Sequence, residues 1–242
     1  MIDGRHIGGI LFDYGGTIDS NGMHWGDVIR LAYEAENIVF PDRTVFRDAY
    51  VHGERTLGRN PIVRPHHTFA DMMHLKIRIQ FDRLKENGFL HGKAAAAETA
   101  HSIANRCYEY AARSVEAARP VIAALTEKYR IALVSNFYGN LNAVLDDFRL
   151  RDFFSAVIES AVVGVRKPDP QIFRLGVEAL HLPPDEVAVV GDSYDKDIVP
   201  STIVGCRTVW LKKTGWNDCD GRETADAIIS DFPELSGIFL ND

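Results

Sequence analysis

The second part of the chain alternates short apolar runs with amphipathic segments, and this alternation limits the possible folds more than any other feature. Apolar runs of four to seven residues bounded by polar or glycine residues are typical of buried strands, and the segments between them have helical spacing. Such an alternation indicates a parallel sheet with helices on both faces. The strand candidates are RIALVSN (130–136), SAVIES (155–160), EVAVVGD (186–192), CRTVWL (206–211) and, more weakly, AIIS (227–230).

A helical stretch interrupts this pattern after the first strand. Residues 7–12 form a short apolar segment, as expected for a buried parallel strand. From about Met23 to Arg113 apolar residues recur three and four positions apart, which predicts helices throughout. We therefore predict an α/β fold: a Rossmann-like doubly wound parallel sheet core formed by residues 1–19 and 114–242, with an inserted all-helical cap domain at residues 20–113.

Charge and composition limit the partners. The chain has 27 basic and 34 acidic residues, a formal net charge of −7, which does not favour a nucleic-acid partner. Between Arg43 and Lys93, however, there are ten basic and five acidic residues. We expect the positive electrostatic potential of this part of the cap to attract an anionic ligand. The sequence leaves the oligomeric state open.

The sequence also bears on location. There is no apolar run of 18 residues and no charged-then-apolar signal pattern at the N-terminus, so we expect no membrane partner. Cys107, Cys206 and Cys219 are widely spaced and odd in number, which indicates neither a disulfide framework nor a zinc ribbon. We expect a cytoplasmic protein.

Polar residues follow the ends of several expected strands. Asp13 follows the first strand, Ser135 and Asn136 end the second, Lys167 precedes a helix, and GDSYDKD (191–197) follows EVAVV. Each alone would be explained as a helix cap or a turn. The carboxyl ends of parallel strands meet at one edge of the sheet, where ligands bind in such folds. The four polar segments together therefore predict a ligand-binding site at this edge of the sheet.

These residues give the chain its resemblance to a known family. It resembles the haloacid dehalogenase-like (HAD) superfamily, whose four motifs occur in this order. Asp13–Thr17 corresponds to motif one, Ser135 to motif two, Lys167 to motif three and Asp192–Asp197 to motif four. The helical insertion lies where one branch of the family carries a helical (type one) cap. The resemblance implies a hydrolase.

The chemistry that fits these residue types is phosphoryl transfer on a small phosphorylated metabolite. A carboxylate such as Asp13 can attack phosphorus and form an aspartyl-phosphate. Mg²⁺, held by a few carboxylates, neutralises the charge of such a reaction. Asp192 is the obvious second ligand. The family pattern favours Asp197 over Asp195 as a further ligand and implies that the backbone carbonyl of Gly15 contributes as well.

The remaining motif residues are expected to handle the charge of the phosphoryl group. Lys167 supplies a point charge for the nucleophile and the phosphoryl oxygens. Ser135 and Thr17 are expected to donate hydrogen bonds to those oxygens. Asn136, which follows the motif-two serine, is expected to line the site.

Gly15 departs from the pattern of the family's phosphatases, which usually carry a second aspartate there as general acid and base. General acid–base catalysis typically contributes about 10²–10⁴-fold, so the loss matters without abolishing turnover. One reading is a phosphohydrolase whose leaving group needs little protonation, or whose acid/base group lies elsewhere. The candidates for that group are Asp19, His24, His52, His66 and His67.

Three other readings stay open. A 2-haloacid dehalogenase also lacks the second aspartate, but that branch replaces the aspartate found here as Asp192. A phosphonoacetaldehyde hydrolase needs a cap lysine for a Schiff base, and the first lysine of the cap, Lys76, falls well into a long helix. The third reading is a non-catalytic protein or a stable phospho-acceptor on the same scaffold.

Substrate choice is expected to reside in the cap. Arg55 and Arg59 are four residues apart, so on a helix they share one face, and we predict that they bind an anionic part of the substrate. Trp25 is expected to pack at the hinge between core and cap. The loop around Trp216 is a further candidate border of the site.

Overall fold

The computed structural model describes residues 7–213 and 224–241. The region around Trp216 and Cys219 lies outside these residues. Six strands form one parallel sheet in the order β3-β2-β1-β4-β5-β6, which confirms the predicted sheet. The strands are β1 (Gly9–Phe12), β2 (Arg130–Ser135), β3 (Ala156–Glu159), β4 (Val187–Gly191), β5 (Arg207–Leu211) and β6 (Ala227–Ile229).

The strand order places a crevice next to the first strand. β1 pairs with β2 on one side and with β4 on the other. The chain first builds outward through β2 and β3, then returns to the opposite side of β1 and continues through β4, β5 and β6. The carboxyl ends of β1 and β4 therefore flank the point at which the order reverses, where ligands bind in open α/β sheets.

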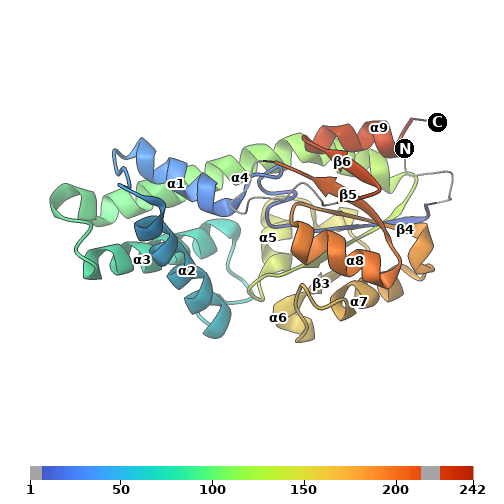
Figure 1. The fold of residues 1–242 in the computed structure, drawn as a ribbon, viewed down its shortest axis with the longest axis horizontal. Helices are drawn as coiled ribbons and strands as arrows, with labels where there is room; N and C mark the ends of the chain where they lie inside the picture. The colour runs from blue at the N-terminus through green and yellow to red at the C-terminus, as the bar shows by residue number, and fades with distance from the viewer. Residues whose placement is uncertain (1–6, 214–223, 242) are drawn as a thin grey trace.

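Helices cover both faces of the sheet (Figure 1). Along β1 the side chains of Ile10 and Phe12 join one apolar cluster, and Leu11 joins the other, as the two-residue period of a strand requires. The first face packs against α4 (Ala97–Thr126), α5 (Leu141–Asp147) and α9 (Leu235–Phe239), and the second against α7 (Gln171–Leu180) and α8 (Val199–Val204). The short helix α6 (Ser160–Val163) follows β3.

The inserted segment is helical, as predicted. It consists of α1 (Trp25–Ala35), α2 (Arg43–Arg59), α3 (Phe69–Glu86) and the first part of α4, which lie together at one end of the molecule (Figure 1). Asp42 caps α2 by accepting hydrogen bonds from two backbone N–H groups. Thr68 and Asp71 form a reciprocal capping box at the start of α3, which satisfies backbone donors that a helix start leaves free.

Helix α4 passes through the predicted domain boundary. The predicted boundary between cap and core follows residue 113, but one helix of 30 residues runs through it, from the cap end of the molecule to the core (Figure 1). Its buried residues, among them Cys107, Ala111, Val115 and Ile122, recur four or seven apart, so a single apolar stripe continues along both parts. Where cap ends and core begins along this helix stays a prediction.

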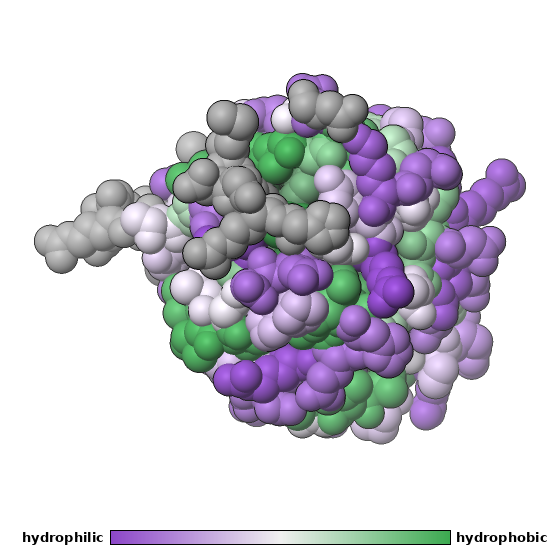
Figure 2. All heavy atoms as spheres, turned by 90° about the vertical axis from the view of Figure 1, so that its right-hand side faces the viewer, coloured by the Kyte–Doolittle hydropathy of each residue, from purple (hydrophilic) through white to green (hydrophobic). Residues whose placement is uncertain are grey.

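The outer surface mixes polar and apolar residues. On the end of the molecule shown in Figure 2, hydrophilic residues are spread among hydrophobic ones. Among the residues that the structure describes, no helix combines the length and apolarity needed to cross a membrane.

Candidate active site

The first residue of the site is Asp13, which directly follows β1 and is buried. Its backbone N–H donates to the carbonyl of Val190 in β4 at 2.9 Å. Its Oδ1 accepts hydrogen bonds from Ser135 Oγ at 2.9 Å and from Lys167 Nζ at 2.7 Å. Ser135 is the last residue of β2. Residues of three motifs that are far apart in the sequence therefore meet at one carboxyl oxygen.

Lys167 is held on both its side chain and its backbone. Its Nζ lies 2.7 Å from Asp13 and 2.6 Å from Asp197 Oδ1. The side chain of Asn136 accepts from the Lys167 N–H at 2.9 Å and donates to the Lys167 carbonyl at 3.1 Å. Burial alone would lower the pKa of Lys167, but the carboxylates of Asp13 and Asp197 raise it. The ammonium therefore stays charged, and Asn136 positions it.

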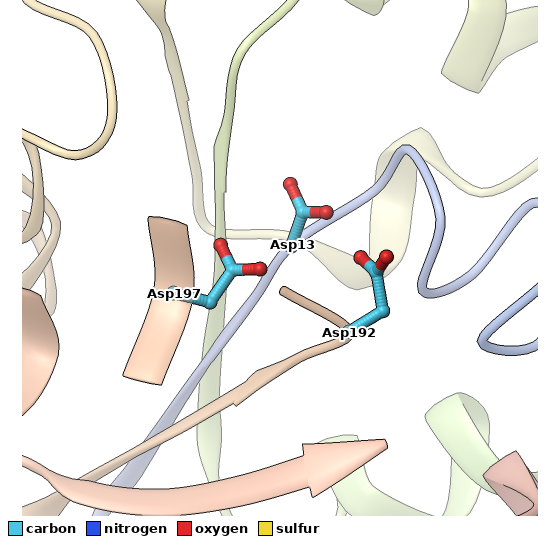
Figure 3. Close-up of side chains that lie close together, drawn as sticks. All are labelled: Asp13, Asp192 and Asp197. Atoms are coloured by element: carbon cyan, nitrogen blue, oxygen red, sulfur yellow. The ribbon is translucent and has the colours of Figure 1, made fainter. Parts of the chain in front are cut away.

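Three carboxyl groups converge beside this lysine. Asp13, Asp192 and Asp197 each offer an oxygen, and these oxygens lie within 4.8 Å of one another. Figure 3 shows the three groups directed into the same space. Asp192 follows β4, Asp197 belongs to a π-helical turn (Tyr194–Ile198), and Thr17 Oγ1 donates to Asp192 Oδ1 at 3.1 Å.

The electrostatics of this cluster fit a divalent cation. Among the described residues it holds three carboxyl groups against the one ammonium of Lys167. Burial raises the pKa of Asp192, and the charges of Asp13 and Asp197 raise it further. Burial likewise raises the pKa of Asp197, although Lys167 opposes this shift. Oxygen ligands at this spacing are those that Mg²⁺ prefers.

The other acidic candidate does not join the cluster. Asp195 is exposed and is not one of the three grouped carboxylates. Asp197 is buried, and its Oδ2 accepts from the Ser193 N–H at 3.0 Å. The choice between the two aspartates thus favours Asp197 as the nearer candidate ligand.

Two adjacent glycines of motif one have different roles. Gly16 has φ +100°, and a Cβ built there would lie 2.5 Å from the carboxyl oxygens of Asp192, so a side chain at this position would displace that carboxyl group. A Cβ built on Gly15 meets nothing closer than Asp19 Oδ2, at 4.0 Å. Position 15 therefore has room for a side chain that it lacks.

The carboxylate cluster lines a cleft of about 600 Å³ between core and cap. Arg55 and Arg59 of α2 both line it, as the sequence predicted for residues that face the substrate, and both are exposed. Their binding role stays a prediction. Of the five candidates for the missing acid/base group, Asp19 and His24 line the cleft. His52, His66 and His67 are absent from its lining.

Trp25 also reaches the cleft. Its indole N–H donates to Asp19 Oδ1 at 2.9 Å, and its ring lies 5.4 Å from that of Phe69 in α3. It therefore packs between the motif-one loop and the cap.

The sequence reasoning missed one group of cleft residues, centred on Lys76. The Lys76 side chain is buried and its Nζ lies 2.8 Å from Glu54 Oε1. Tyr138, in the loop after β2, donates to Glu54 Oε2 at 2.6 Å. All three line the cleft. The signal was present, because Lys76 and Gln80 interrupt an otherwise apolar buried face of α3 that includes Met72, Met73 and Ile77.

Lys76 is paired rather than poised for covalent chemistry. Burial would lower its pKa, but the charge of Glu54 raises it well above the ordinary value. Conversely, Lys76 outweighs the effect of burial on Glu54 and lowers the pKa of that carboxyl group. A lysine that forms a Schiff base needs a depressed pKa, so this pairing disfavours the phosphonoacetaldehyde hydrolase reading.

Comparison with known proteins agrees with the motifs. A family model described as haloacid dehalogenase-like hydrolase matches residues 7–199, and a second, HAD-hydrolase-like, matches residues 164–235. The chain is 40% identical over 88 residues to a glyceraldehyde 3-phosphate phosphatase of Pyrococcus furiosus, covering 36% of this chain and 37% of that protein. It is 36% identical over 86 residues to a phosphoserine phosphatase of Thermus thermophilus, covering 36% and 34%.

Each of these alignments spans about a third of the relative's length. Among solved structures, a HAD-hydrolase of Bacillus subtilis bound to magnesium matches with a TM-score of 0.60 and 18% identity over 97% of this chain and 99% of that one. A dehalogenase matches with a TM-score of 0.64 and 14% identity over 100% of both chains. At such identities the likeness shows the fold alone.

Proposed function

This chain belongs to the haloacid dehalogenase-like hydrolase family, and we propose that it is a Mg²⁺-dependent phosphohydrolase that acts on a small phosphorylated metabolite. The observation that carries the proposal is the convergence of Asp13, Lys167, Asp192 and Asp197 in one cleft. The phosphatases among its relatives support the same reaction. We further propose that the helical insertion is a type one cap.

The proposed reaction begins at Asp13. One carboxylate oxygen forms a bond to phosphorus while the bond from phosphorus to the leaving oxygen breaks, which gives an aspartyl-phosphate. Water then attacks phosphorus, the bond to Asp13 breaks, and inorganic phosphate leaves. Two hydrogen bonds, from Ser135 and Lys167, fix the orientation of the carboxylate before the attack.

The surrounding groups stabilise charge during both steps. The Lys167 ammonium lies close enough to Asp13 to contact an oxygen of the transferred group, where a fixed charge in a water-poor site is most effective. Mg²⁺ would be held by Asp13, Asp192 and Asp197, with the Gly15 carbonyl as an expected further ligand, and would offset the negative charge of nucleophile and phosphate. Thr17 fixes the Asp192 carboxyl group.

Arg55 and Arg59 suggest the kind of metabolite. Both residues line the cleft, and guanidinium groups bind carboxylates and phosphates through paired hydrogen bonds. We propose a substrate with a second anionic group at the end that faces α2. The free thiols of Cys107 and Cys206 are usual in a reducing compartment and support a cytoplasmic location as part of this proposal.

The test is release of inorganic phosphate from p-nitrophenyl phosphate and from a panel of small alkyl phosphates and acyl phosphates. Each substrate is assayed with Mg²⁺ and with chelator, for the wild type and for Asp13→Asn. We expect release that requires Mg²⁺ and is lost in the variant. Absence of release from every substrate, together with chelator-insensitive chloride release from 2-chloropropionate, would assign the protein to the dehalogenases instead.

A further inference from the structure

The described site contains a nucleophile and a charge stabiliser but no evident proton donor. An alkyl phosphate needs a proton on its leaving oxygen, and the attacking water must later lose one. Gly15 has no side chain, and the proton-bearing Lys167 is already engaged by two carboxylates. Any acid/base group must therefore reach the cleft from another position of the chain.

The position of Asp19 meets this requirement. Its side chain is buried to 1% exposure, yet it contributes to the lining of the cleft that holds Asp13. A Cβ built on Gly15 would lie 4.0 Å from Asp19 Oδ2, and within the described residues no other atom apart from those of its chain neighbours comes within 4 Å. A carboxyl group carried by residue 15 and the carboxyl group of Asp19 would thus converge on the same space.

The hydrogen bonds of Asp19 leave one oxygen for chemistry. Oδ1 accepts from the Gly16 N–H at 2.7 Å and from the Trp25 indole N–H at 2.9 Å. Within residues 7–213 and 224–241, no hydrogen bond or ion pair is found at Oδ2. The first oxygen fixes the carboxyl group on the motif-one loop, and the second is free to hold or release a proton.

The environment of Asp19 suits a group that exchanges protons near neutral pH. Burial and, to a smaller extent, the charge of Asp13 raise its pKa, whereas the two hydrogen bonds and Lys76 lower it, and together they place the pKa of Asp19 at about 7. The charge of Asp19 in turn raises the pKa of two nearby phenols, those of Tyr14 and Tyr110. A pKa near the operating pH gives a general acid and base its greatest effect.

The other acid/base candidates in the cleft are less suited. His24 uses Nδ1 to accept the N–H of Gly26, and burial lowers its pKa to about 4, so at neutral pH it is a neutral imidazole and a poor general acid. Glu54 is kept ionised by Lys76 and is also bound by Tyr138.

We propose that Oδ2 of Asp19 is the general acid and base of this site, in place of the side chain absent at Gly15. As the bond from phosphorus to the leaving oxygen breaks, the proton on Oδ2 passes to that oxygen. In the second step the Asp19 carboxylate takes a proton from the attacking water, and the bond from phosphorus to Asp13 breaks. An ester and water become an alcohol and phosphate, and both aspartates are restored. This inference rests on the proposed phosphohydrolase function.

The test compares Asp19→Asn with the wild type on two substrate classes in the presence of Mg²⁺. Asparagine keeps an oxygen that accepts both hydrogen bonds but cannot donate a carboxyl proton. On alkyl phosphates we expect kcat/KM to fall by about 10²–10⁴-fold. On p-nitrophenyl phosphate, whose leaving group needs no proton, we expect a much smaller loss. Equal losses on both classes would overturn the proposal and leave Asp19 a structural role in the loop.

A rescue variant tests the same idea in the reverse direction. Position 15 is outside the left-handed region and has room for a side chain, so Gly15→Asp combined with Asp19→Asn should recover alkyl phosphate hydrolysis at least tenfold over Asp19→Asn alone. No recovery would count against the proposal. A wild type that releases phosphate from neither class would refute the phosphohydrolase function and this inference with it.

If Asp19→Asn does not fold, Trp25→Phe provides a second test. It removes the indole hydrogen bond that lowers the pKa of Asp19. The proposal predicts that the alkaline limb of the pH profile for alkyl phosphates moves to higher pH in this variant. An unmoved limb would contradict it, because a merely structural Asp19 does not set that limb.

Discussion

Two buried lysines lie on opposite sides of the cleft, and the carboxyl groups around them differ. Lys167 of the core has a side chain 3% exposed and contacts Asp13 and Asp197, with Asp192 beside them. Lys76 of the cap has a side chain 6% exposed, and its Nζ forms an ion pair with Glu54 and lies 5.1 Å from the centroid of the Tyr138 ring. Among the described residues, the core group carries three carboxyls for one ammonium, and the cap group carries one for one.

This difference indicates two roles. The cap pair is balanced, and Tyr138 of the core donates to its carboxylate, so it holds the cap against the core. The core group keeps an excess of negative charge in a buried place, which costs free energy unless a cation offsets it. Excess charge therefore marks the reacting side of the cleft, and balanced charge marks the side that shapes it.

The largest effect should come from removing each lysine in turn. Lys167→Met leaves buried carboxylates without their partner and should lower the free energy of unfolding by about 3–5 kcal/mol. Lys76→Met leaves the half-buried Glu54 without its partner and should lower it by less. Mg²⁺ should recover part of the loss for Lys167→Met, because a cation can replace the missing charge there, and none for Lys76→Met. Thermal unfolding with and without Mg²⁺ measures this. If Mg²⁺ restored the same amount of stability to both variants, the proposed difference between the core group and the cap pair would be contradicted.

Both groups affect the pKa of Asp19, since Asp13 raises it and Lys76 lowers it. Its pKa of about 7 in the folded protein exceeds the ordinary 3.8, so the folded state is favoured by the proton on Asp19 below about pH 4 and loses that advantage as the pH rises through about 7. Without added metal, Asp19→Asn should therefore gain stability relative to the wild type as the pH rises, by at most about 4 kcal/mol. Urea titrations from pH 4 to 8 measure the difference, and a constant difference would contradict the shift.

Cation binding should also separate the two groups. At a Mg²⁺ concentration of 100 times its Kd, the wild type should gain about 2.7 kcal/mol of stability, and Asp192→Asn should lose most of this gain. Glu54→Gln is the matched control, because it alters a cleft carboxylate outside the core group and should respond to Mg²⁺ like the wild type. Differential scanning calorimetry over a series of Mg²⁺ concentrations gives both values.

The smallest effect is expected on the cap side. Arg55→Ala and Arg59→Ala should each raise KM about tenfold, or about 1.4 kcal/mol, for substrates with a second anionic group, with little change for p-nitrophenyl phosphate. Arg47, exposed on the same helix and absent from the cleft lining, is the control. If Arg47→Ala raised KM equally, the effect would be one of overall charge rather than of contact.

The core side and the cap side of the cleft also differ in how well the sequence predicts them. The core side was readable, because each apolar strand is followed by a polar residue and parallel strands bring those residues to one edge. Asp13, Ser135 and Asp192 were found in this way and Lys167 from its place before a helix, and the structure brings the four together.

The cap side was harder to read, since the rotation of each helix about its axis decides which residues face the cleft. Lys76 was therefore missed, although its place on an apolar face was a usable signal. The cap boundary was also hard to place, because the apolar stripe of α4 does not break at residue 113. Asp19 was one of several acid/base candidates, and it took the fold to show which of them reach the cleft.

The most direct test of the account is to trap the covalent intermediate. A radiolabelled alkyl phosphate is mixed with the Mg²⁺-loaded protein, the reaction is quenched in acid within the first turnover, and the protein is digested and mapped. The account predicts label on the peptide that contains Asp13, released by hydroxylamine as expected for an acyl phosphate, and no label in Asp13→Asn. Turnover without labelled protein, or label on a different residue, would contradict the assignment of Asp13 as the nucleophile.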